Sequence, residues 1–184
     1  MPVWLIVVIA VLVLILLYVI GTYNKLVRSR NKVEGEWAQI DVQLKRRIDL
    51  IPNLVETVKG YAAHENETLE AVIAARNKAV SATTPEEEIK SAGEVSQALS
   101  RLLALTESYP DLKANENFLK LQDDLKDTED KIAYARQFYN DASKSYKNLV
   151  EMFPSNIIAS IFGFKAKPFF EIEAADREVP KVQF

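Results

Sequence analysis

The chain has 184 residues, 23 of them basic and 26 acidic, and it contains no cysteine. A formal net charge of −3 excludes a domain-wide attraction to nucleic acid. The absence of cysteine excludes disulfides, thiol catalysis and thiolate metal sites.

Residues 3–20 predict a transmembrane helix. From Val3 to Ile20 there is no charged residue, amide, proline or glycine. At about 1.5 Å per residue, a helix of this length spans roughly 27 Å, close to the hydrocarbon thickness of a bilayer. Trp4 and Tyr18 lie near its two ends, where aromatic rings favour the membrane interfaces. We therefore expect residues 1–22 to be a membrane anchor.

Two alternatives to an anchor are less favourable. A buried core helix is rarely apolar on every face over five turns. A cleaved signal peptide would have a basic start, a shorter apolar run and a small-residue cleavage site, and none of these features is present. We therefore expect the segment to be retained.

A cluster of basic residues follows the apolar segment and predicts its orientation. The cluster consists of Lys25, Arg28, Arg30 and Lys32. The positive-inside rule places this flank in the cytoplasm, with the N-terminus outside the inner membrane and the rest of the chain inside. The same side chains are candidates for contact with anionic lipid headgroups.

Residues 23–184 predict one all-helical domain. A packed helix face is predicted by residues at spacings of three and four, which are Leu26, Arg30, Val33, Trp37, Ile40 and Leu44. Nothing from residue 22 to 31 interrupts the helix that precedes this face. Pro52 is expected to break or kink this helix, so a second helix is predicted over 50–81. Thr84, Pro85 and Glu87 form the pattern of a capping box, which predicts a third helix to about residue 108.

A long fourth helix is predicted from residue 118 to 153, where Pro154 ends it. Four long amphipathic helices joined by short loops predict an antiparallel up-down four-helix bundle. A long parallel coiled-coil oligomer is the alternative. Residues 154–184 are a short aromatic C-terminal segment that we expect to pack on the bundle, with docking on the bilayer or on a partner as the alternative.

The sequence offers little for catalysis or metal binding. His64 is the only histidine, and there is no glycine-rich phosphate loop or nucleophile elbow. We therefore predict no enzyme activity, no cofactor and no metal. Arg30, Glu65 and Arg76 fall at or near inward positions, which predicts a buried polar layer or a small-ligand site; the alternative is that their charged ends extend to water.

Several motifs resemble the LemA family of bacterial membrane proteins. They are Trp37-Ala38-Gln39-Ile40-Asp41, Asp49-Leu50-Ile51-Pro52-Asn53-Leu54, Val58-Lys59-Gly60-Tyr61, Phe153-Pro154-Ser155-Asn156 and Phe162-Gly163-Phe164. The resemblance covers essentially the whole chain. It implies an N-terminal anchor and an antiparallel helical bundle, and it implies no activity because the family has no accepted catalytic motif.

Three functions are weighed on this basis. The first is a non-enzymatic, membrane-anchored helical module that organises or recruits proteins at the bacterial cell membrane, with the lipid bilayer and protein partners or further copies of the chain as its contacts. The second is a small-ligand or ion sensor that uses the polar residues within the bundle. The third, least favoured, is a hydrolase or transferase that uses His64.

Overall fold

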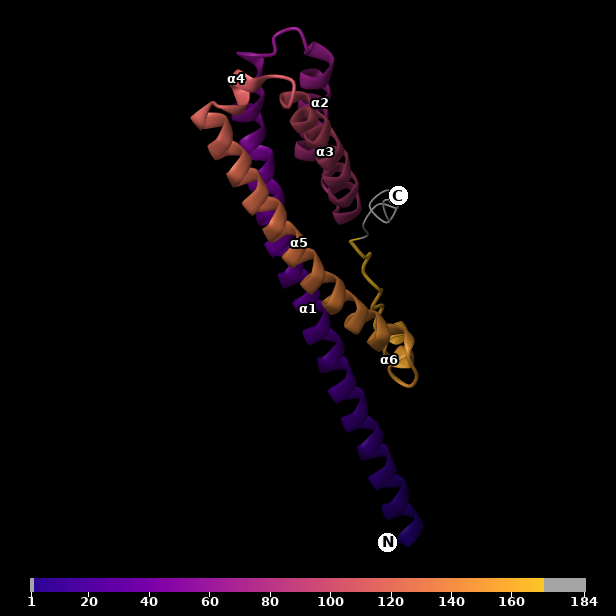
Figure 1. Ribbon diagram of the computed structural model, residues 1–184. Coiled ribbons are helices and arrows are strands. Elements are labelled where there is room, and N and C mark those ends of the chain that lie inside the picture. Colours follow the sequence, from indigo (N-terminus) through magenta and orange to yellow (C-terminus); the bar gives the residue numbers. More distant parts are fainter. Residues whose placement is uncertain (1, 171–184) are drawn as a thin grey trace, which may run out of the picture. The chain divides into compact units, whose positions relative to one another are not determined.

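The computed structural model describes residues 2–170, and every regular element in that range is a helix. These elements, shown in Figure 1, are α1 (Val3–Lys59), α2 (Asn66–Ser81), α3 (Pro85–Thr106), α4 (Pro110–Lys113), α5 (Glu116–Glu151) and α6 (Ser155–Ile161). Residues 171–184 of the predicted C-terminal segment lie outside the described residues. The chain divides into a first unit, residues 1–38 with 137–169, and a second unit, residues 39–136 with Phe170.

Helix α1 runs without a break from the apolar segment to Lys59, as Figure 1 shows. The prediction that the apolar segment continues into the next helix is confirmed, but the predicted break at Pro52 is wrong. A proline inside a helix costs about 3 kcal/mol. Around Pro52, Ile51, Leu54 and Val55 are all at least 95% buried, and burying each such side chain contributes about 1.5–3 kcal/mol. Packing of this face therefore outweighs the cost of the proline.

The chain turns after Lys59 instead. The N–H groups of Tyr61 and Ala62 both bond to the Val58 carbonyl, and α2 begins at Asn66. This turn is tied to the loops around α4 by side chains. Tyr109 Oη donates to Glu65 Oε1 at 3.1 Å, and Asn115 Nδ2 donates to Tyr61 Oη at 3.0 Å.

The second unit has one apolar core to which five helices contribute. Buried side chains come from α1 (Ile51, Leu54, Val58), α2 (Leu69, Val72), α3 (Val95, Leu99, Leu102), α4 (Leu112) and α5 (Phe118, Leu125). The predicted capping box at the start of α3 is confirmed, because Thr84 Oγ1 accepts from the Glu87 N–H and the Glu87 carboxylate accepts from the Thr84 N–H. Between the predicted third and fourth helices, residues 110–113 form the one-turn helix α4.

The first unit packs α1 against α5 and the segment after α6. Leu26 and Val33 of α1 are buried, as are Tyr139 and Tyr146 of α5. The Trp37 and Tyr139 rings meet edge to face with centroids 5.1 Å apart. Tyr139 Oη also donates to the Pro168 carbonyl at 2.7 Å, so the described part of the C-terminal segment packs on this unit.

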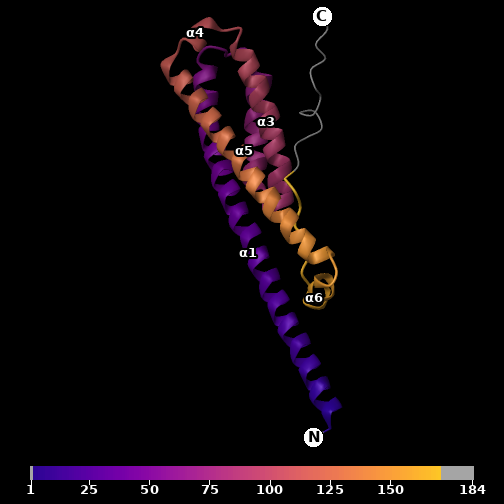
Figure 2. The same ribbon diagram turned by 60° about the horizontal axis from the view of Figure 1, so that its bottom comes forward.

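Gly163 adopts a left-handed backbone conformation and sets the direction in which the chain leaves α6. Gly163 has φ +71°, and the N–H groups of Gly163 and Phe164 bond back to the carbonyls of Ser160 and Ala159. This pattern is a Schellman motif, which ends α6 (Figure 2) and favours glycine at the left-handed position. It brings the Phe164 ring within 5.7 Å of the Tyr23 ring, measured between centroids.

Candidate functional site

Arg47 is the one charged side chain that is buried among the described residues, with 2% of its surface exposed. It extends from α1, and its guanidinium bonds to two other helices. Nη2 donates to the Ala92 carbonyl of α3 at 2.9 Å, and Nη1 donates to Ser96 Oγ of α3 and Glu129 Oε1 of α5, both at 2.9 Å. Because an arginine presents five fixed donors, it can join three helices at a single point.

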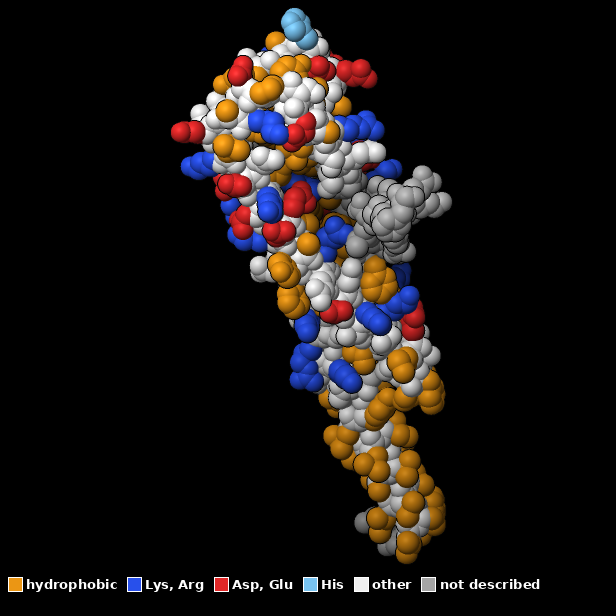
Figure 3. All heavy atoms as spheres, viewed as in Figure 1, with side chains coloured by type: hydrophobic (Ala, Val, Ile, Leu, Met, Phe, Trp, Pro, Cys, Tyr) orange, Lys and Arg blue, Asp and Glu red, His pale blue; other side chains and the backbone are white. Residues whose placement is uncertain are grey.

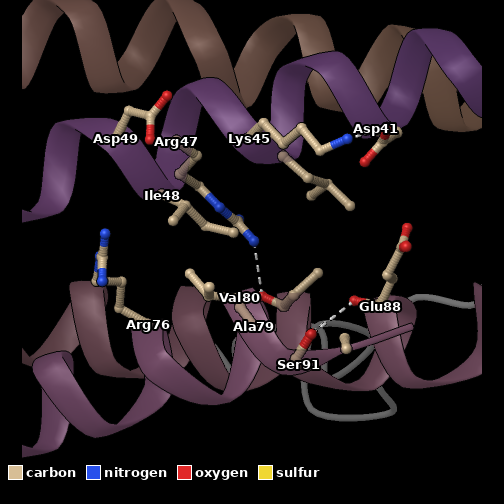
Figure 4. Close-up of a pocket in the computed structure, with 13 residues that line it drawn as sticks. Asp41, Lys45, Arg47, Ile48, Asp49, Arg76, Ala79, Val80, Glu88 and Ser91 are labelled. Atoms are coloured by element: carbon tan, nitrogen blue, oxygen red, sulfur yellow. Dashed lines mark hydrogen bonds and ion pairs between the residues drawn. The ribbon is translucent and has the colours of Figure 1, made fainter. Parts of the chain in front are cut away.

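A hollow of about 360 Å³ lies beside Arg47 in the second unit. Figure 4 shows Arg47 reaching across it from α1 toward α3, with Arg76 and Glu88 rising from the opposite helices. Three polar atoms here are buried without a hydrogen-bond partner among the described residues: Arg47 Nε, Arg76 Nε and Glu88 Oε2. The hollow therefore holds both donors and an acceptor whose bonding capacity is unused.

The charges around Glu88 are unevenly balanced. Burial and the Asp41 carboxylate raise the pKa of Glu88, while Lys45 opposes this change. Lys45 is itself held by Asp41, with Nζ 2.6 Å from Oδ2, and this hydrogen bond raises the pKa of Lys45. The hollow is therefore lined by carboxylates and cations at close range.

The three residues of the predicted buried layer are divided between the two units, with Arg30 in the first and Glu65 and Arg76 in the second. Arg30 belongs to the first unit, where its side chain is 43% exposed, 3.9 Å from Glu34, and its guanidinium carbon lies 5.6 Å from the centre of the Phe164 ring. Glu65 is half-buried and accepts from Tyr109. Only Arg76 lines the hollow. No ion pair joins these three in the part of the chain that the structure describes.

Sequence reasoning missed Arg47, although a signal was present. The predicted packed face extends from Leu26 to Leu44. Continued at the same spacings of three and four, the face runs through Arg47 to Ile51, Leu54 and Val58. An arginine at an inward position of an unbroken helix was therefore the signal.

The other predicted residues lie on the surface. In the predicted span, Val3, Trp4, Tyr18 and Ile20 are 45–76% exposed. Lys25, Arg28 and Lys32 are exposed just after it, on one face of α1. His64 is exposed in the turn before α2, and in residues 2–170 no group of three histidine or acidic side chains is placed to hold a metal ion.

One helix of the described chain is long and apolar enough to cross a membrane. An 18-residue window of α1 has a mean hydropathy of 3.4, and none of that window is buried. The structure thus defines an all-helical protein with a candidate membrane-spanning helix at its N-terminal end. It belongs to the LemA family, whose model matches residues 36–184.

Relatives of the chain come from several bacteria. It is 27% identical over 162 residues to "Protein LemA" of Metamycoplasma hominis, an alignment that covers 86% of this chain and 73% of that protein. It is 26% identical over 179 residues to "Magnetosome protein MamQ 2" of Paramagnetospirillum magneticum and 25% identical to "Magnetosome protein MamQ" of Magnetospirillum gryphiswaldense. These alignments cover 83% of this chain and 66% of each magnetosome protein. None of these names states an enzymatic activity.

The neighbouring residues Arg46 and Arg47 test the energetic role of the buried guanidinium. We expect Arg47→Ala to lower the free energy of unfolding by about 3 kcal/mol, because it removes the three hydrogen bonds of a buried guanidinium and opens a cavity. Arg46, 3.5 Å from Asp124 and from Asp127, is a surface pair, so Arg46→Ala should cost less than about 1 kcal/mol. Thermal unfolding of the full chain in detergent, followed by circular dichroism, measures both. Equal losses would contradict the assigned role of Arg47.

Two adjacent glutamates are expected to respond to pH with opposite signs. The raised pKa of Glu88 means that its charge disfavours folding, and this cost develops as the pH rises above 4.5, the ordinary value. Hydrogen bonds from the Thr83 and Thr84 N–H groups lower the pKa of Glu87, so its charge favours folding until the pH falls through that lowered value. At pH 7, Glu88→Gln should therefore raise the melting temperature and Glu87→Gln should lower it.

Both differences should shrink as the pH is lowered toward 3, because the glutamates then take up protons. Melting curves of the two variants and the parent chain between about pH 3 and 7 provide the measurement. Shifts of the same sign in both variants would show that the local electrostatics are assigned incorrectly.

Proposed function

We propose that this chain is a non-enzymatic, membrane-anchored helical module that organises or recruits proteins at the bacterial cell membrane. The observation that carries the proposal is the continuity of α1, which begins as an uncharged, exposed apolar helix and ends inside the core of a helical unit. An 18-residue stretch that is apolar on every face and uncovered by protein requires another apolar phase, and a bilayer supplies it.

We also propose that α2, α3, α5 and the second half of α1 form an antiparallel up-down bundle. Support comes from the shared core of the second unit and from the short connection between α2 and α3, which favours antiparallel neighbours. Such a bundle presents long rigid helix faces to a partner. Ile73 and Val80, which are 42% and 57% exposed on α2, are apolar positions on one such face.

The orientation that we propose has the N-terminus outside and the helical units in the cytoplasm. It is supported by the cluster of Lys25, Arg28, Arg30 and Lys32 on one side of the apolar segment. Because the chain has no cysteine, single cysteines can report it directly. A membrane-impermeant maleimide should label His64→Cys only in inverted vesicles and the matched control Pro2→Cys only in intact cells. The reverse pattern would contradict the orientation.

Recruitment is tested by photo-crosslinking in living cells. A photoreactive phenylalanine analogue at Ile73 or Val80 should give discrete adducts, either with another protein or with a second copy of the chain. The matched control carries the same analogue in a chain with Leu12→Arg, in which the apolar segment is disrupted and the adducts should be lost. The absence of a discrete adduct at every exposed α2 position, in cells whose membranes contain the chain, would count against recruitment.

A second function, sensing of a small ligand, is favoured by the hollow beside Arg47. Its unused donors on Arg47 and Arg76 and its unused acceptor on Glu88 match a small molecule that carries both charges, such as an amino acid. Ala79→Phe would fill the hollow without altering these groups. A melting temperature that rises with added amino acids in the parent chain, but not in Ala79→Phe, would support sensing; an equal response of the two would exclude it.

A further inference from the structure

Exposed apolar side chains cluster where α5 passes into α6. Five of them are each more than half exposed: Met152 (61%), Phe153 (79%), Ile157 (52%), Ile161 (71%) and Phe162 (52%). We call this cluster the α5–α6 corner. Figure 3 shows hydrophobic side chains on the surface in this part of the first unit. Side chains of this size and exposure, gathered within eleven residues, mark an interaction surface.

The corner lies at the level where the apolar segment of α1 ends. The Phe162 ring meets the Tyr23 ring edge to face, with centroids 4.8 Å apart. Tyr23 follows Ile20 by three residues, which is about 4.5 Å along a helix axis. Both belong to the first unit, so the position of the corner relative to the apolar segment is set by direct contact. If α1 crosses a bilayer, the corner therefore lies at the interface.

A basic hollow adjoins the corner. Its volume is about 680 Å³, and its lining comes from α1, α5 and the first residues after α5. Lys25, Arg28 and Lys32 contribute the charges, while Met152 and Phe153 belong to both the hollow and the corner. No carboxylate lines it. The hollow thus combines positive charge and polar donors with an apolar rim.

These charges are available to an outside partner. Within residues 2–170, none of Lys25, Arg28 and Lys32 forms an ion pair. The nearby carboxylate of Glu34 is already approached by Arg30 at 3.9 Å and by Lys167 at 3.8 Å. Over residues 1–38 and 137–169 there are eight basic and four acidic side chains, a net charge of +4. The unit therefore attracts anions.

We propose that the α5–α6 corner and the basic hollow form a binding site for the headgroups of anionic phospholipids in the bilayer that α1 crosses. The phosphate enters the hollow between the basic side chains of α1, and the apolar side chains of the corner enter the boundary of the acyl chains. The inference rests on the proposed function, because it requires α1 to span a membrane. Lipid is favoured over a protein occupant because the site is continuous with the apolar segment and carries the charge complementary to an anionic leaflet.

A fluorescent label on the full chain tests the insertion of the corner. Phe153→Cys is labelled with a polarity-sensitive dye and reconstituted in vesicles of phosphatidylcholine alone or with ~30% phosphatidylglycerol. Lipids brominated near the headgroup should quench this label at least twofold more strongly than a label at Phe138→Cys. Phe138 is a matched control: it is 58% exposed in α5 of the same unit, about 20 Å along the helix from its end. Equal quenching at the two positions would overturn the proposal.

The contribution of the basic hollow is tested by charge removal. Quenching at position 153 should rise several-fold when phosphatidylglycerol is added, and the combined variant Lys25→Gln, Arg28→Gln and Lys32→Gln should lose this rise. The control variant Lys120→Gln, Lys126→Gln and Lys131→Gln removes three charges from the second unit and should retain it. A rise that survives removal of the three α1 charges would overturn the assignment of the hollow.

A third label separates this inference from the proposed anchor. Leu12→Cys should be quenched by lipids brominated deep in the acyl chains. Quenching at Leu12 without quenching at Phe153 would overturn the inference and leave the anchor intact, whereas failure at both positions would overturn both. The remaining outcome is a label at Phe153 that is shielded in native membranes but not in vesicles that contain the purified chain as their sole protein. That result would identify another protein as the occupant and would overturn the proposal.

Discussion

The continuity of helix α1, which runs from Val3 through Pro52 to Lys59, is the constraint on which the rest of the structure depends. One helix carries three successive surfaces: an apolar one from Val3 to Ile20, a basic one from Lys25 to Lys32, and a core-forming one that reaches Val58. A break near Pro52 would divide the last of these, because Ile40 and Leu44 are buried before the proline and Leu54 and Val58 after it. Burial of Ile51, Leu54 and Val55 holds the helix together there, so packing in the second unit keeps α1 helical through Pro52 to Lys59.

The charged side chains discussed above are of two kinds: those that hold helices together inside the protein and those that are exposed to solvent. Arg47 is surrounded by protein acceptors on α3 and α5, and its main effect is to fix how these helices meet α1. Its Nε nevertheless lies at a hollow together with Arg76 and Glu88, so the same side chain leaves one donor unused. The basic side chains after the apolar segment have the opposite character, since Lys25, Arg28 and Lys32 are exposed and face a second hollow. Function at a membrane surface is best sought among the exposed groups.

Local signals in the sequence predicted most of the helices, and long-range packing explains what they missed. The apolar periodicity predicted the burial of Leu26, Val33 and Ile40, and the capping box predicted the start of α3. Pro52 was interpreted by its local cost alone, which core burial exceeds. The inward position of Arg47 was missed separately, because the packed face was not followed past Leu44. A candidate site built from Arg30, Glu65 and Arg76 required knowledge of which helix faces meet, and single-chain periodicity does not contain it. The hollow beside Arg47 retains only Arg76 from that set.

The central claim is that the apolar segment of α1 holds the chain in a membrane. The most direct measurement is extraction of cell membranes at alkaline pH, which releases peripheral proteins and leaves spanning ones in the pellet. The parent chain should remain in the pellet, and a variant with Leu12→Arg and Ile15→Arg should move to the supernatant, because an arginine at the centre of a spanning helix costs roughly 2.5–3.5 kcal/mol. Release of the parent chain under these conditions would contradict the account.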